Sequence, residues 1–108
     1  MAELVKLCPT SEVPENSVKS YEVGNNVLAV YHVDGEFFVT DNECTHGAAS
    51  LAEGILEDGV IECTLHFGAF NVKTGKAVQA PCFTNLRTYK VVLQDGQVMV
   101  DLDKEAGD

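Results

Sequence analysis

Two short stretches of this sequence combine cysteine and histidine at close spacing. The first contains Cys44 and His46, the second contains Cys63 and His66, and residues 47–62 separate them. Thiolate sulfur and imidazole nitrogen are both good ligands for transition metals. A Cys and a His two or three residues apart can reach one metal centre from a single turn. We therefore expect the two stretches to form one four-ligand metal site.

Two kinds of metal centre compete for this ligand set. One is a tetrahedral Cys2His2 zinc site, and the other is a 2Fe–2S cluster in which two His replace two Cys on one iron. Structural zinc sites usually pair Cys with Cys and His with His. Here each stretch carries one Cys and one His. This mixed arrangement favours the iron–sulfur centre, in which each stretch ligates both irons.

The residues around the ligands carry a family resemblance. The segments Cys-Thr-His-Gly (44–47) and Cys-Thr-Leu-His-Phe-Gly-Ala-Phe (63–70) resemble the Rieske ferredoxins of bacterial aromatic-ring-hydroxylating dioxygenases. The resemblance extends over essentially the whole chain. It implies that Cys44 and Cys63 ligate one iron and that His46 and His66 ligate the other.

Four positions separate this chain from respiratory Rieske proteins. Those proteins resemble it, but they carry a disulfide between the ligand loops where this chain has Ala49 and Leu65. They also carry Ser and Tyr hydroxyls, donors to the cluster and ligand sulfurs, where this chain has Gly68 and Phe70. A hydrogen bond to sulfur stabilises the added electron and raises the reduction potential. We therefore expect a potential near the lower end of the Rieske range, roughly −150 mV.

Composition limits the other classes of function. The chain has 108 residues, enough for one domain with a small core, and we expect a single Rieske domain over residues 1–108. Its net charge of −10 argues against binding nucleic acid and is compatible with steering toward a basic redox partner. No run approaches the roughly 20 apolar residues that span a membrane, and no secretory signal is visible, so we expect a cytoplasmic protein.

The remaining cysteines, Cys8 and Cys82, lie outside the two ligand stretches. Their number permits a disulfide between them. Because a cytosolic chain keeps its thiols reduced, we favour two free thiols.

The elements that must position the ligands are short and β-rich. Four X-Gly turns, at 34–35, 58–59, 74–75 and 95–96, punctuate apolar segments, and no long helical pattern occurs. We expect an all-β chain with one helical turn at 50–54 that points Leu51 inward. The expected strands are 3–7, 18–23, 27–33, 36–40, 60–62, 67–72, 77–79, 88–93 and 97–102. The resemblance implies the Rieske fold, with three antiparallel sheets and a cluster-binding subdomain of about 43–82 inserted in a larger β base.

Other residues have weaker claims to a role. By position, Pro81 matches a proline-bearing loop that covers the cluster in the family. His32 has no Cys or His partner nearby, so we interpret it as structural. The phenylalanines at 37, 38, 67 and 70 are expected mostly in the core, although Phe67 follows a ligand and could shield the cluster. The resemblance also implies that the outer imidazole edges of His46 and His66 reach the surface and offer a short electron path.

The function that follows is one-electron transfer. The resemblance implies that an NAD(P)H-dependent flavin reductase reduces this protein, which then passes electrons to the terminal oxygenase of the dioxygenase system. The sequence lacks a G-x-G-x-x-G dinucleotide fingerprint, and only one His remains for a mononuclear iron site, so we expect a monomeric carrier and not an enzyme. Two alternatives remain: the small Rieske subunit of a nitrite reductase, and a zinc-stabilised binding module without redox function.

Overall fold

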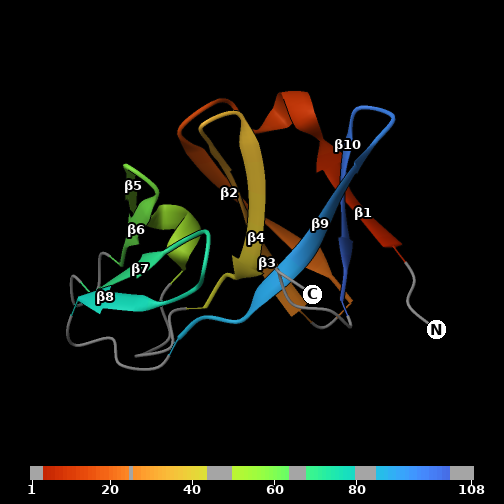
Figure 1. The fold of residues 1–108 in the computed structure, drawn as a ribbon. Coiled ribbons are helices and arrows are strands. Elements are labelled where there is room, and N and C mark those ends of the chain that lie inside the picture. Colours follow the sequence, from red (N-terminus) through yellow and green to blue (C-terminus); the bar gives the residue numbers. More distant parts are fainter. Residues whose placement is uncertain (1–3, 25, 44–49, 64–67, 80–84, 103–108) are drawn as a thin grey trace.

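Two antiparallel sheets make up the computed structural model (Figure 1). The structure describes residues 4–24, 26–43, 50–63, 68–79 and 85–102. Within these ranges the regular elements are strands and two short 3-10 helices, η1 (Thr10–Glu12) and η2 (Leu51–Glu53). The prediction of an all-β chain is therefore confirmed.

The larger sheet has six strands in the order β1-β10-β9-β4-β3-β2. The ladder between β4 and β9 has two register pairs, Val39–Tyr89 and Thr40–Thr88. This sheet, called the base here, thus consists of two three-stranded halves joined by a short ladder. Together with the smaller sheet, the halves account for the three antiparallel sheets implied by the resemblance. The base strands are β1 (Leu4–Pro9), β2 (Ser17–Val23), β3 (Asn26–Val33), β4 (Glu36–Asp41), β9 (Thr88–Gln94) and β10 (Gln97–Asp101).

The smaller sheet has four strands in the order β5-β6-β7-β8 and follows β4 and precedes β9 in the chain. It lies to one side of the base, at the left of Figure 1. Each of its strands has three residues: β5 (Ile55–Glu57), β6 (Val60–Glu62), β7 (Ala69–Asn71) and β8 (Ala77–Gln79). We call it the cluster sheet, because one predicted ligand, Cys63, directly follows β6.

Strand β5 was not expected from the sequence. Ile55–Glu57 directly follows the expected helical turn at 50–54, and it forms a strand because it pairs with β6 across the predicted Asp58-Gly59 turn. Asp58 and Gly59 both have positive φ, 51° and 77°. This is the backbone of a type I′ hairpin, and Asp-Gly is among the dipeptides that adopt it most readily.

Strand β3 lies between two hydrophobic cores and faces both. Leu28 and Val30 pack into a core inside the base, whereas Ala29, Tyr31 and Val33 pack toward the cluster sheet. Alternate side chains of a strand point to opposite faces, so a strand buried on both faces has an almost continuous apolar sequence. The sequence of β3 has this pattern.

Several local predictions are confirmed. Leu51 in η2 is fully buried and points inward. His32 is structural: its Nδ1 lies 2.8 Å from the Val13 carbonyl oxygen, and its ring stacks on Phe37. Cys8 is a buried free thiol whose pKa is raised by burial.

Other expectations have a partial outcome. Phe70 is fully buried, whereas Phe37 and Phe38 are only partly buried. Phe67, Pro81 and Cys82 lie outside the described residues. Among the described residues, no helix is long and apolar enough to cross a membrane.

Candidate metal centre

Of the four predicted ligands, the structure describes one. Cys63 lies at the end of β6, while Cys44, His46 and His66 fall outside the described residues. The structure therefore shows how the ends of the ligand-bearing segments are held.

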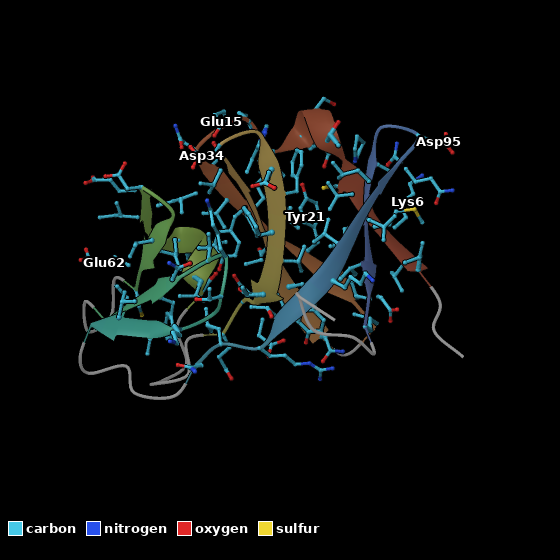
Figure 2. All side chains as sticks on the ribbon, in the orientation of Figure 1. Lys6, Glu15, Tyr21, Asp34, Glu62 and Asp95 are labelled. Atoms are coloured by element: carbon cyan, nitrogen blue, oxygen red, sulfur yellow. The ribbon has the colours of Figure 1, made fainter. Side chains whose placement is uncertain are left out.

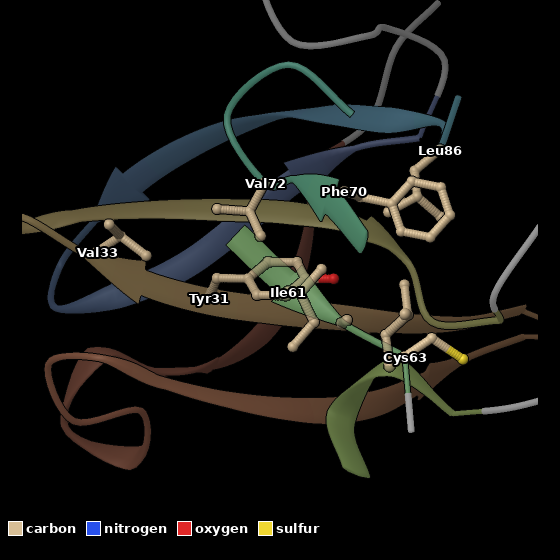
Figure 3. Packing of buried hydrophobic residues seen from close by; sticks show 9 residues of the cluster. Tyr31, Val33, Ile61, Cys63, Phe70, Val72 and Leu86 are labelled. Carbon is tan, nitrogen blue, oxygen red and sulfur yellow. The ribbon is translucent and has the colours of Figure 1, made fainter. Parts of the chain in front are cut away.

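Cys63 is held at the edge of the core. Cys63 is 1% exposed. It belongs to the hydrophobic core between the cluster sheet and β3. In Figure 3 the Cys63 sulfur points away from the Tyr31 ring, at the periphery of this hydrophobic core. The Cys63 N–H donates to the Gly68 carbonyl at 2.7 Å, which closes the segment 64–67 at its base.

The first ligand segment is closed in a similar way. Glu43 and Ser50, which flank residues 44–49, form an isolated antiparallel bridge. The neighbouring Asn42 carbonyl accepts a hydrogen bond from the Leu51 N–H at 2.8 Å. Both ends of this segment are thereby fixed next to each other.

A third segment, 80–84, contains the predicted covering proline. The Ala77 N–H donates to the Asn85 side-chain oxygen at 3.0 Å, and the Leu86 N–H donates to the Gly75 carbonyl at 2.7 Å. Hydrogen bonds thus join the chain before this segment to the chain after it.

The residues that flank the three segments pack in one hydrophobic core. Leu51 follows the first segment, Cys63 and Phe70 flank the second, and Leu86 follows the third, and all four belong to the same core (Figure 3). The described residues that flank the three segments therefore share one hydrophobic core. This arrangement fits a metal centre that takes ligands from the first two segments and cover from the third.

The predicted ligand set also fits the chemistry of a 2Fe–2S centre. Cysteine thiolates hold such clusters, and in Rieske centres two His replace two Cys on one iron. At the positions where respiratory relatives carry hydroxyls, Phe70 is an apolar, fully buried side chain and Gly68 is buried backbone. Neither residue contributes a hydroxyl donor.

The outer face of the cluster sheet is acidic and shallowly hollowed. A groove of about 320 Å³ is lined by Ile55, Glu57, Val60, Glu62 and Ala69. Figure 2 shows Glu62, the residue before Cys63, on this outer side. Two carboxylates, those of Glu57 and Glu62, therefore lie on this outer face.

The family follows from this fold and site together with a direct sequence match. Residues 3–90 match the family model described as the Rieske [2Fe-2S] domain. The chain therefore belongs to the Rieske [2Fe–2S] domain family, whose cofactor is a Rieske-type 2Fe–2S cluster.

Within that family, its relatives are ferredoxin components of aromatic dioxygenase systems. The chain is 48% identical over 91 residues to the ferredoxin component of a naphthalene 1,2-dioxygenase system from Pseudomonas aeruginosa, covering 84% of this chain and 88% of the relative. It is 42% identical over 100 residues to the ferredoxin component of biphenyl 2,3-dioxygenase from Rhodococcus jostii (strain RHA1), covering 93% and 94%. These relatives are electron-transfer proteins and not catalytic enzymes, and the chain groups with them.

Solved structures agree with this assignment. The ferredoxin of Sphingomonas yanoikuyae B1 is 41% identical, with a TM-score of 0.88 over 92% of this chain and 98% of that chain. A structure described as a complex of reduced oxygenase and oxidized ferredoxin in carbazole 1,9a-dioxygenase is also 41% identical, with a TM-score of 0.85 over 91% and 92%.

Sequence reasoning missed the residues that hold the ends of the segments. Asn42 has no characteristic spacing from the proposed ligands, and its contacts arise only in the folded chain. The available signal for Asn42 was an Asn shortly after the expected strand 36–40, in a connection where Asn side chains often bond to nearby backbone.

Proposed function

We propose that this chain carries single electrons from an NAD(P)H-dependent flavin reductase to the terminal oxygenase of an aromatic-ring-hydroxylating dioxygenase. Cys44, Cys63, His46 and His66 are the proposed ligands of its 2Fe–2S cluster. The main support is the convergence of the three segment ends on the core around Cys63, in a chain that matches the Rieske family. We further propose one domain over 1–108 with a cluster-binding subdomain of about 43–82, acting as a cytoplasmic monomer.

The bound cluster supplies reversible one-electron chemistry. The protein's part is to hold the ligands and to control access of water and partners. Burial of Cys63 and its backbone bond to Gly68 hold one proposed ligand in place. We assign to Pro81 the role of limiting water access from the third segment.

The proposed partners are a reductase and an oxygenase. A ferredoxin–oxygenase complex of a carbazole dioxygenase is among the similar structures, which supports the oxygenase as acceptor. The net charge of −10 favours docking to a basic surface. We expect the electron-transfer rate to fall as ionic strength rises, because the Debye length is about 10 Å at 0.1 M salt.

The two alternatives have less support. A putative nitrite reductase small subunit shares the fold, with a TM-score of 0.77, but at 19% identity that likeness concerns the fold alone. A zinc-stabilised module is distinguished by its metal content.

The deciding experiment is metal and sulfide analysis of the purified protein, followed by EPR and potentiometric titration. We expect iron and acid-labile sulfide, a rhombic EPR signal when reduced, and a midpoint potential near roughly −150 mV. Ser replacing Cys44 or Cys63, or Gln replacing His46 or His66, should abolish the wild-type signal. The matched controls Cys8→Ser and His32→Gln should keep it. Zinc in place of iron would refute the proposal, and a strongly positive potential would refute the argument from Gly68 and Phe70.

A further inference from the structure

We propose that Asn42 is a positioning residue for the metal centre. It fixes the ends of the first ligand segment to each other and, through the turn that follows, to the residue before Cys63. The inference rests on the proposed ligand roles of Cys44 and His46.

Asn42 contacts both sides of the first ligand segment. Its residue is 7% exposed, its side-chain amide donates to the Ser50 hydroxyl oxygen at 2.9 Å, and its side-chain oxygen accepts from the Ala52 N–H at 3.0 Å. Its main chain adds two hydrogen bonds, from its own N–H to the Val27 carbonyl at 3.0 Å and from the Leu51 N–H to its carbonyl at 2.8 Å. Asn42, on one side of the segment, is thus hydrogen-bonded to three residues on the other side and also to β3.

The geometry makes these bonds a constraint on the proposed ligands. Glu43 and Ser50 are bridge partners, and bridged residues lie roughly 4.5–5.5 Å apart at Cα. Among the described residues, this bridge belongs to none of the named strands. The Asn42 side chain supplies two further hydrogen bonds between the two ends of the first ligand segment. Cys44 lies only two residues after Asn42. Without the Asn42 side chain, the two ends of the first ligand segment can separate.

The constraint continues to the second ligand segment through Gly54. The Gly54 N–H donates to the Leu51 carbonyl at 2.9 Å, which closes the turn that Asn42 anchors at Leu51 and Ala52. A Cβ on Gly54 would collide with the Glu62 carbonyl oxygen, so this turn lies directly against the residue before Cys63. Asn42 therefore acts on the relative placement of the two ligand segments as well as on the first one.

Asn71 provides a matched control with similar bonding at another place. Its side-chain oxygen accepts from the Lys73 and Thr74 N–H groups at 2.9 and 3.3 Å, and its residue is half-buried. These bonds lie within the turn between β7 and β8 and do not bridge a proposed ligand segment. If Asn42 only stabilised the fold, Asn42→Ala and Asn71→Ala would both lower the melting temperature, and neither would specifically alter the EPR signal of the metal centre.

The test compares Asn42→Ala, Ser50→Ala and Asn71→Ala in the iron-loaded protein. The readouts are the EPR g-values of the reduced state, the midpoint potential, and the rate of iron release to a chelator, with a thermal melt to measure stability separately. Second-sphere changes around metals typically cost 10–100-fold in affinity. For Asn42→Ala we expect altered g-values and about tenfold faster iron release. The lower end of the range applies because Asn42 bonds to the backbone and a hydroxyl at the ends of the segment and not to a ligand atom. Ser50→Ala should give a smaller change in the same direction.

Asn71→Ala should lower the melting temperature and leave the g-values and potential unchanged. Wild-type g-values and iron release in Asn42→Ala, or equal shifts in Asn71→Ala, would overturn the inference. If Asn42→Ala does not fold, Ser50→Ala decides, since it removes one bond and leaves Asn42 in place. A Cys44→Ser variant that keeps the wild-type signal would instead overturn the ligand assignment, which separates the two failures.

Discussion

The base and the cluster sheet are both antiparallel, but they are stabilised differently. Base strands have five to eight residues, and the core inside the base is built from that sheet and its connections. Cluster-sheet strands have three residues each, and their core includes Ala29, Tyr31 and Val33 of β3. A sheet this small buries little apolar area by itself. The geometry of the redox site therefore depends on contacts outside its own strands, including the base, the segment ends and the metal.

The largest expected effect comes from removing the aromatic side chain that the cluster sheet itself contributes to its core, Phe70. Phe70→Ala should cost about 3–5 kcal/mol of unfolding free energy, because it leaves a cavity among fully buried neighbours. Val100→Ala in the base core should cost about 2 kcal/mol. Denaturant unfolding measures both, and visible absorbance follows the cluster. Only Phe70→Ala should also accelerate iron loss, and equal acceleration by Val100→Ala would contradict the separation of the two regions.

Removing the iron should affect the cluster sheet before the base. A ligand present at 100 times its dissociation constant stabilises a structure by about 2.7 kcal/mol, so local opening of the cluster sheet should become on the order of 100-fold more frequent. Hydrogen exchange of peptides containing Ile61 and Phe70 should reveal this, while peptides from β3 and β10 should change less. Uniform loss of protection would show that the regions unfold as one unit.

Within the base, the join between its halves should be sensitive to alkaline pH. The Tyr89 hydroxyl donates to Asp41 Oδ1 at 2.5 Å, and burial, followed by this bond and the Asp41 charge, raises the pKa of Tyr89 to about 12. A folded pKa above the ordinary value of 10.0 means that this stabilisation is complete below pH 10 and disappears as the pH rises through 12.

Tyr89→Phe should therefore cost about 2 kcal/mol at neutral pH, the usual range for a hydrogen bond to a charged group. The difference between wild type and variant should shrink between pH 10 and 12, measured by urea unfolding. A difference that stays constant over that interval would exclude the proposed linkage. The EPR signal should be unchanged, since this contact belongs to the base.

Gly54→Ala should cost about 1–3 kcal/mol, because its Cβ would collide with the backbone carbonyl of Glu62 and the turn must shift away from β6. The control is Gly96→Ala, at φ +73° with open space around it, which should cost a similar amount through backbone strain alone. Only Gly54→Ala should alter the EPR g-values. Identical signals from both variants would mean that the turn after the first segment does not position the second.

The sequence predicted the local elements well because each had a local cause. Asp-Gly dipeptides specify tight hairpins, and the structure confirms positive φ at Asp34, Asp58 and Asp95. The continuous apolar run of β3 predicted a strand, and its burial on both faces explains that composition. Strand β5 was missed because it directly follows the expected helical turn at 50–54 and becomes a strand through its pairing with β6.

The ligand set and the family also came from the sequence, since metal chemistry depends on residue type and on spacing along the chain. Cys44, His46, Cys63 and His66 could be proposed without any fold. Tertiary structure alone decided the contacts of the residues that flank the ligand-bearing segments: the shared core of Leu51, Cys63 and Leu86, and the bonds of Asn42 to Ser50 and Ala52. It also decided the pairing of β1 with β10 and of β4 with β9. These contacts join residues far apart in the chain or depend on side-chain direction. No local pattern records them, because they exist only once the chain has folded.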